Sequence, residues 1–262
     1  AAEVFRAADE AGVIALEAMR PLHDPAFHQA AGLLDGIGTV RRATLRFGKY
    51  SSRYDDILAG KRTNIFDCDM ASGALMDIGV YCVEPMIALF GEPDSISCAP
   101  ALLDEATREL THGPIDGAGV ICARYAGKVV TLHYSKITAD LAENQVEGEL
   151  GTWTLDAIST PSHVRIDMRG VAVRNAAKQM GYSSTETQTT EVDLPPCENS
   201  MCHELADFVT AVEAVGQGAP AGSAPCGPFG DTLSFRAITL ASLRVMDEAR
   251  RQAGVVFPAD RA

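Results

Sequence analysis

The spacing of apolar residues predicts a helix, a strand and a second helix at the start of the chain. Residues 2–11 carry apolar side chains at helical spacing, and Gly12 is a typical helix stop. The β-branched run at 13–19 predicts a strand directly after this helix. The stretch 24–38 predicts another helix with Asp24 as its N-cap. A helix followed closely by a strand is half of an α/β layer unit, which cannot bury its own apolar surface.

The next segment leads to a long apolar helix. We expect a strand at 40–50, a polar loop at 51–69 and a helix from about 73 to 90 that stops at Gly91. Pro85 lies inside this helix, where it removes a backbone hydrogen bond or causes a bend.

After residue 93 the pattern changes to short alternating strands, with Gly-containing hairpin turns at 125–129 and 149–153. Two further helices are separated by a loop rich in Gly, Pro, Ser and Ala. The pattern predicts an α+β fold, a predominantly antiparallel open sheet with helices on one face. The expected strands are 95–103, 117–125, 128–137, 143–150, 152–158, 162–168, 171–175 and 187–193, and the expected helices are 198–215 and 231–253.

Composition and charge narrow the possible partners. The chain has 262 residues, 47% of them hydrophobic, and a net charge of −13, which opposes binding to nucleic acid. We find no apolar stretch near the roughly 18 residues that span a bilayer, and no signal sequence, and therefore expect a cytoplasmic protein without a membrane partner.

The seven cysteines form no CxxC motif, which favours reduced thiols. Their one cluster is Cys197, Cys202 and the adjacent His203, with Cys226 further on. A zinc site is conceivable there, but the spacing matches no common template, so we expect local packing and no metal.

The segment "SGALMDIGVY" at 72–81 places Asp77 and Tyr81 four residues apart on one helix face. That spacing suits a catalytic site and equally an ordinary buried hydrogen bond. A GxGxxG loop at a strand-to-helix turn is absent from the sequence, so we expect this chain alone not to hold a dinucleotide tightly.

Five spaced motifs resemble the Gfo/Idh/MocA oxidoreductases, in particular their dihydrodiol dehydrogenase-like branch. They are "EAMRPLHDPAF" at 17–27, "YSSRYD" at 50–55, "SGALMDIGVY" followed by "LFGEPDSI", "VEGELGTWTLD" at 146–156 and the terminal "VVFP". The resemblance implies an N-terminal Rossmann domain for NAD or NADP and a C-terminal sheet domain for substrate and oligomer contacts. We expect residues 1–22 to be the trailing helix and strand of a truncated dinucleotide-binding domain, and residues 23–262 to be the substrate domain.

The resemblance also implies roles for individual residues. Tyr81 would exchange a proton with the substrate while hydride passes to or from the nicotinamide, and Asp77 would orient a lysine outside this chain or the substrate hydroxyl. Helix glycines at 73 and 79 either let the cofactor approach closely or serve tight packing. The expected substrate contacts are Arg20, His23, Lys49, Arg53 and Tyr54, and the expected cofactor contacts are Gly73 and Gly79.

The resemblance therefore favours the C-terminal part of an NAD(P)-dependent oxidoreductase for a sugar, polyol or diol. The chain alone would be inactive, and it would form a homodimer or homotetramer through its sheet. The alternative is a binding or oligomerisation module that keeps the sheet domain and performs no chemistry.

Overall fold

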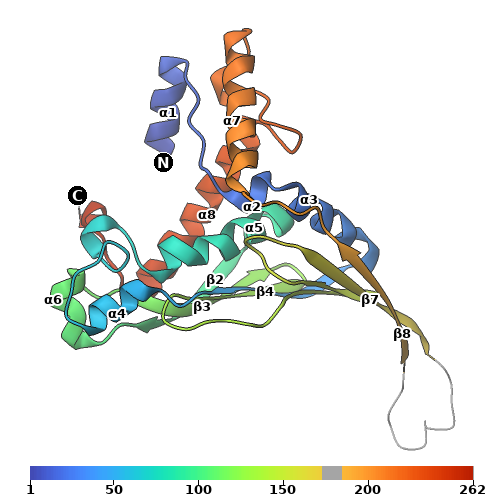
Figure 1. The fold of residues 1–262 in the computed structure, drawn as a ribbon, viewed down its shortest axis with the longest axis horizontal. Helices are drawn as coiled ribbons and strands as arrows, with labels where there is room; N and C mark the ends of the chain where they lie inside the picture. The colour runs from blue at the N-terminus through green and yellow to red at the C-terminus, as the bar shows by residue number, and fades with distance from the viewer. Residues whose placement is uncertain (173–184, 262) are drawn as a thin grey trace, which may run out of the picture.

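The computed structural model describes residues 1–172 and 185–261, which form one eight-stranded sheet with helices on one face (Figure 1). The strand order is β2-β3-β4-β1-β5-β6-β7-β8, and every neighbouring pair is antiparallel except β1 and β4. The predicted α+β class is confirmed. The strands are β1 Val40–Gly48, β2 Ser95–Leu102, β3 Asp116–Tyr125, β4 Lys128–Ser135, β5 Asn144–Gly148, β6 Gly151–Leu155, β7 His163–Ala172 and β8 Thr185–Asp193.

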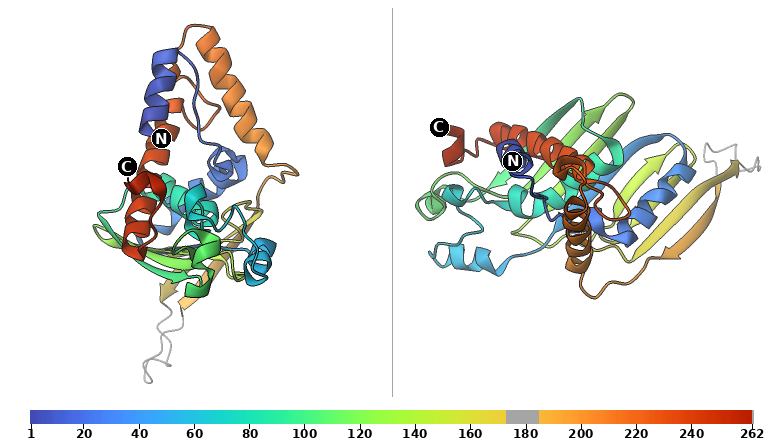
Figure 2. Two further views of the ribbon diagram at one scale, coloured as in Figure 1. Left: turned by 90° about the vertical axis from the view of Figure 1, so that its left-hand side faces the viewer. Right: turned by 90° about the horizontal axis from the view of Figure 1, so that it is seen from above.

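The helices form two groups. Helices α2, α3, α5 and α8 lie over the sheet, whereas α1 and α7 project away from it, as Figure 1 and the left view of Figure 2 show. Their bounds are α1 Ala2–Ala11, α2 Arg20–His23, α3 Pro25–Gly32, α4 Ser52–Leu58, α5 Val80–Phe90, α6 Arg108–Thr111, α7 Met201–Gly216 and α8 Thr232–Ala253.

Local signals are confirmed where they act within a few residues. Gly12 ends α1 in the left-handed conformation, with φ 65°. The side chain of Asp24 accepts a hydrogen bond from the backbone N–H of Ala26 and so caps α3. Both predicted hairpins form, one between β3 and β4 and one between β5 and β6.

Three predicted elements need correction. No strand forms at 13–19, because none of the eight strands pairs with this segment. The polar loop at 51–69 contains α4, which is capped by Ser51 and held by its buried residue Ile57. The two strands expected at 162–168 and 171–175 are one continuous strand, β7, as far as residue 172, and 173–175 lie outside the described residues.

Residues 1–15 are fastened to α8 by Arg236. Its guanidinium donates to the Asp9 carboxylate at 2.6 Å and to the Ala15 carbonyl at 3.2 Å, and it lies over the Phe5 ring. Since the Arg236 side chain is almost fully buried, these contacts position α1 and the extended segment that follows it.

The predicted helix at 73–90 is confirmed, but it begins with a π-helical turn at Leu75–Gly79 before α5. It packs against β1 and β4 on one side and α8 on the other. The stretch Cys68–Phe90 has a mean hydropathy of 1.5, so by length and composition it could cross a membrane, contrary to our expectation from the sequence. Because 67% of that window is buried inside the structure, it fits the core helix of a globular fold.

We predict that Gly79→Ala destabilises the fold. A Cβ at residue 79 would lie 2.9 Å from Leu75 Cδ1 and 3.1 Å from Tyr134 Cγ, so overpacking should exceed the helix-propensity gain of about 1 kcal/mol and leave a net loss of about 1–2 kcal/mol. Chemical denaturation measures this loss. Gly32→Ala is the matched control, because no atom lies within 4 Å of its Cβ position; equal stability of the two variants would contradict the packing explanation.

Candidate active site

Tyr81 of α5 meets the guanidinium of Arg20 at the start of α2. Arg20 Nη2 donates a hydrogen bond to the Tyr81 hydroxyl at 2.9 Å, and Arg20 Cζ lies 5.4 Å from the centre of the phenol ring. The Phe47 ring packs edge-on against Tyr81 at 5.3 Å. The phenol is thus fixed from two sides, and its oxygen faces a cation.

Asp77, one turn earlier, forms an ion pair with Lys136, which follows directly after β4. The Asp77 side chain is 37% exposed, whereas that of Lys136 is 11% exposed. Burial lowers the pKa of the Lys136 ammonium, and the nearby positive charge of Lys49 lowers it further. Asp77 therefore balances a partly buried cation and remains open to solvent.

Strand register brings these two pairs to the same end of the sheet. In the parallel pair β1–β4, Phe47 lies opposite Tyr134 and Gly48 lies opposite Ser135, next to Lys136. The segment after β1 continues beside the end of β4, and the Ser51 N–H donates a hydrogen bond to the Lys136 carbonyl. A pocket of about 280 Å³ opens there, lined by Lys49, Tyr50, Ser51, Ser52, Ile78 and Lys136.

A buried carboxyl group, Asp116 of β3, positions the turn that carries Asp77. Its Oδ2 accepts a hydrogen bond from the Leu75 N–H at 2.7 Å. Burial raises the Asp116 pKa to about 6, although hydrogen bonds from backbone N–H groups oppose that shift. Gly73 has φ 124°, and a Cβ there would lie 2.5 Å from Asp116 Oδ1, so the close approach needs glycine.

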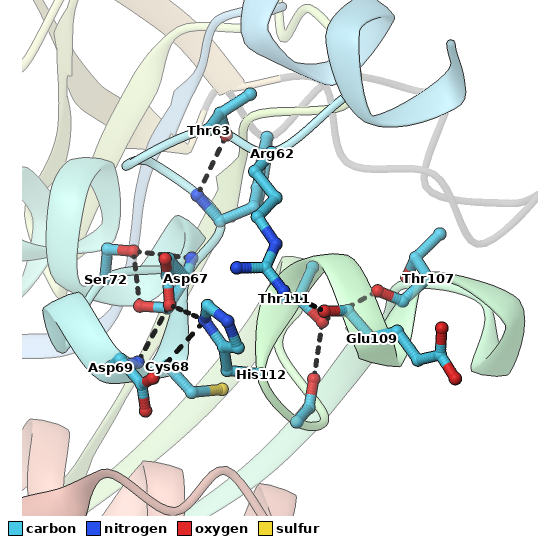
Figure 3. A network of polar contacts seen from close by, with 12 residues as sticks. Arg62, Thr63, Asp67, Cys68, Asp69, Ser72, Thr107, Glu109, Thr111 and His112 are labelled. Atoms are coloured by element: carbon cyan, nitrogen blue, oxygen red, sulfur yellow. Dashed lines mark hydrogen bonds and ion pairs between the residues drawn. The ribbon is translucent and has the colours of Figure 1, made fainter. Parts of the chain in front are cut away.

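The loop before this turn is fixed by a second polar network (Figure 3). Asp67 Oδ1 accepts hydrogen bonds from the Asp69 N–H at 2.9 Å and pairs with His112 Nδ1 at 2.7 Å. The Ser72 hydroxyl bonds to the Asp67 backbone on the other side. These contacts anchor the chain immediately before Gly73.

Arg20 also connects the site to the start of α7. Its Nη1 lies 3.5 Å from the hydroxyl of Ser200, the residue before α7. Three residues along α5 from Tyr81, the carboxyl of Glu84 is 1% exposed. Burial raises its pKa well above the ordinary value, and Glu17 raises it further.

Some residues predicted from the sequence lie away from these pairs. The His23 side chain is fully buried, with Nδ1 2.7 Å from Asp207 Oδ2 and its ring stacked on Phe235, so a ligand has no access to it here. Arg53 is exposed on α4 and pairs with Asp56, and Tyr54 packs against Phe66.

The two helix glycines are buried and face protein atoms. Gly73 adjoins Asp116, and Gly79 adjoins Leu75 and Tyr134, which is the packing alternative that the sequence left open. Of the predicted site residues, Arg20 pairs with Tyr81, Asp77 pairs with Lys136, and Lys49 lines the pocket beside Lys136.

Sequence reasoning missed Lys136. The sequence does show a lysine directly after the apolar alternation of 128–135. A charge at the end of a buried strand needs an opposite charge beside it. Nothing in the local pattern identifies that partner as Asp77, which is 59 residues away.

Comparison with known proteins identifies relatives of the whole chain. A model of the "GFO/IDH/MocA C-terminal domain" matches residues 28–154. The scyllo-inositol 2-dehydrogenase (NADP(+)) IolU of Bacillus subtilis (strain 168) is 32% identical over 260 residues, which are 99% of this chain and 68% of IolU. The uncharacterized oxidoreductase YgjR of Escherichia coli (strain K12) is 29% identical over 97% of this chain and 66% of YgjR.

A solved structure shares the fold. KijD10, a 3-ketoreductase from Actinomadura kijaniata in complex with NADP and TDP-benzene, superposes with a TM-score of 0.67 at 20% identity. The match covers 95% of this chain and 66% of KijD10. The chain thus spans about two thirds of the length of these relatives.

We predict that Asp116→Asn changes how stability depends on pH. The raised pKa means that the folded state binds the Asp116 proton more tightly than the unfolded state, so the wild type loses stability as pH rises from about 4 to 7. Asn keeps an acceptor for the Leu75 N–H and does not ionise. Relative to the wild type, Asp116→Asn should gain roughly 2–3 kcal/mol in unfolding free energy across this range.

Chemical denaturation at pH 4, 5.5 and 7 measures this difference. Asp104→Asn, at an exposed position, is the control and should follow the wild type. A constant difference between Asp116→Asn and the wild type at all three pH values would contradict a buried, titrating Asp116.

Proposed function

The chain belongs to the Gfo/Idh/MocA oxidoreductase family, and we propose that it forms the substrate side of an NADP-dependent dehydrogenase or ketoreductase for a polyol or sugar. The observation that carries this proposal is the contact of Arg20 with the Tyr81 hydroxyl, next to the Asp77–Lys136 ion pair. These two pairs place a proton donor and a charge-balanced carboxylate at one end of the sheet.

Tyr81 is suited to exchange a proton with the substrate oxygen. When a substrate hydroxyl is oxidised it must lose its proton, and when a carbonyl is reduced the new alkoxide must gain one. The Arg20 guanidinium, 2.9 Å from the phenolic oxygen, stabilises negative charge that develops there. Arg20 does not accept a proton itself, because guanidinium stays charged.

Asp77 is suited to bind and orient a substrate hydroxyl. Its carboxylate is partly exposed, and an ionised carboxylate accepts hydrogen bonds from hydroxyl donors. Lys136 keeps this carboxylate in place and offsets its charge. Ser51 and Ser52 line the adjoining pocket and add polar surface that suits a polyhydroxylated ligand.

NADP is the proposed cofactor, because IolU is named as an NADP(+) enzyme and the KijD10 structure contains NADP. The described ranges 1–172 and 185–261 contain no glycine-rich turn from a strand into a helix, so these residues do not fit the pyrophosphate of a dinucleotide. What the chain's own residues supply is substrate binding and the proton.

The face of the sheet opposite the helices is the proposed contact between subunits. The hydroxyls of Thr44 and Thr131 pair at 3.1 Å from positions that alternate with the buried residues Ala43 and Leu45, so they point away from the helix layer. A dimer or tetramer formed through this face would be detected by light scattering.

We predict that Tyr81→Phe lowers kcat roughly 10²–10⁴-fold with little change in cofactor affinity, because only the proton-exchanging oxygen is removed. The assay uses the full-length protein with scyllo-inositol and NADP⁺ and follows NADPH absorbance. Tyr125→Phe is the control: it removes a phenol that donates to the Gly91 carbonyl at the other end of the sheet. Unchanged turnover of Tyr81→Phe would remove Tyr81 from the mechanism.

A further inference from the structure

Cys197, Cys202 and His203 converge where the chain enters α7. The two Sγ atoms are 4.0 Å apart, and one ligand atom from each of the three residues lies within 4.8 Å of the others. Both cysteines are exposed, so an ion in solution can reach them.

The sulfur atoms and the imidazole ring of this cluster make no hydrogen bond to any other residue in the part of the chain that the structure describes. Their one hydrogen-bonding contact there joins the Sγ atoms of Cys197 and Cys202, and the His203 ring makes no hydrogen bond. By contrast, the buried thiols donate to backbone carbonyls, as Cys68 does to Pro114 and Cys226 to Asp207. No hydrogen bond to another residue therefore occupies the two thiols or the His203 ring in the described part of the chain.

The geometry matches the demands of one metal. With Zn–S bonds of about 2.3 Å, two thiolates on a tetrahedral zinc lie about 3.8 Å apart, close to the distance observed. Two thiolates and an imidazole bind Zn²⁺ in preference to hard cations such as Mg²⁺, which favour oxygen ligands. We propose that Cys197, Cys202 and His203 bind one zinc ion, with water in the fourth position.

The second candidate cluster shows why this inference is specific. Asp67, Asp69 and His112 also bring ligand atoms together (Figure 3). There, Asp67 Oδ1 already accepts from the Asp69 N–H and pairs with His112 Nδ1, which explains the arrangement without an ion. It therefore carries no metal proposal.

A metal at the start of α7 would fix the residue that contacts Arg20. Ser200 lies between Cys197 and Cys202, and its hydroxyl is 3.5 Å from Arg20 Nη1. Arg20 in turn holds the Tyr81 hydroxyl. The ion would thus order one wall of the candidate site without touching the substrate.

Cobalt(II) titration of the reduced full-length protein, with a phosphine reductant, tests the site. Binding should give thiolate-to-cobalt charge-transfer bands at one equivalent, and Zn²⁺ should displace the signal. Cys197→Ser and Cys202→Ser should each weaken binding by more than about tenfold, and His203→Gln should weaken it less. Two thiol protons are released per ion bound, so affinity should fall as pH falls.

Cys122→Ser, on β3, is the matched control and should bind cobalt like the wild type. Far-UV circular dichroism confirms that each variant is folded. The proposal is overturned if the reduced protein gives no charge-transfer band, or if Cys197→Ser and Cys202→Ser bind cobalt as the wild type does. It is equally overturned if the two thiols form a disulfide under mild oxidation but show no metal affinity when reduced. Since the readout is metal binding, it is independent of any oxidoreductase activity.

Discussion

The burial of the helical segment Leu75–Phe90 between the sheet and α8 is the constraint on which the candidate site depends. A helix covered on two sides has few positions that face solvent. Polar side chains are tolerated mainly at those positions, because the others are buried among apolar residues. Asp77 and Tyr81 are among the few polar residues that remain partly accessible on this helix. In this segment, which begins with a π-helical turn at Leu75–Gly79, Asp77 pairs with Lys136 and Tyr81 pairs with Arg20.

The electrostatics of the site follow from pairing inside a partly desolvated layer. Lys136 is nearly buried and is tolerated there because Asp77 lies beside it. Arg20 shares its donors between Tyr81 and Ser200, which links α5 to the start of α7. Burial, together with the neighbouring Glu17, raises the pKa of the Glu84 carboxyl and so favours its neutral form. The arrangement therefore pairs the phenol with one cation, Arg20, and the partly exposed Asp77 carboxylate with another, Lys136.

The same chain of contacts joins the site to regions that do no chemistry. Asp116 holds the turn before Asp77 from β3, and the Asp67–His112 pair anchors the loop before it. At the other end, Ser200 follows directly on the Cys197 loop.

Features that depend on neighbours in sequence were predictable: the helix stop at Gly12, the cap at Asp24, the two hairpins and the period-2 strands. The motif at 72–81 also identified Asp77 and Tyr81 as candidates. Tertiary structure alone decided which partners they meet, that His23 is buried and paired with Asp207, and that residues 13–19 pair with no strand. The physical reason is that caps and turns are satisfied within a few residues, whereas ion pairs, strand pairing and side-chain burial join segments far apart in the sequence.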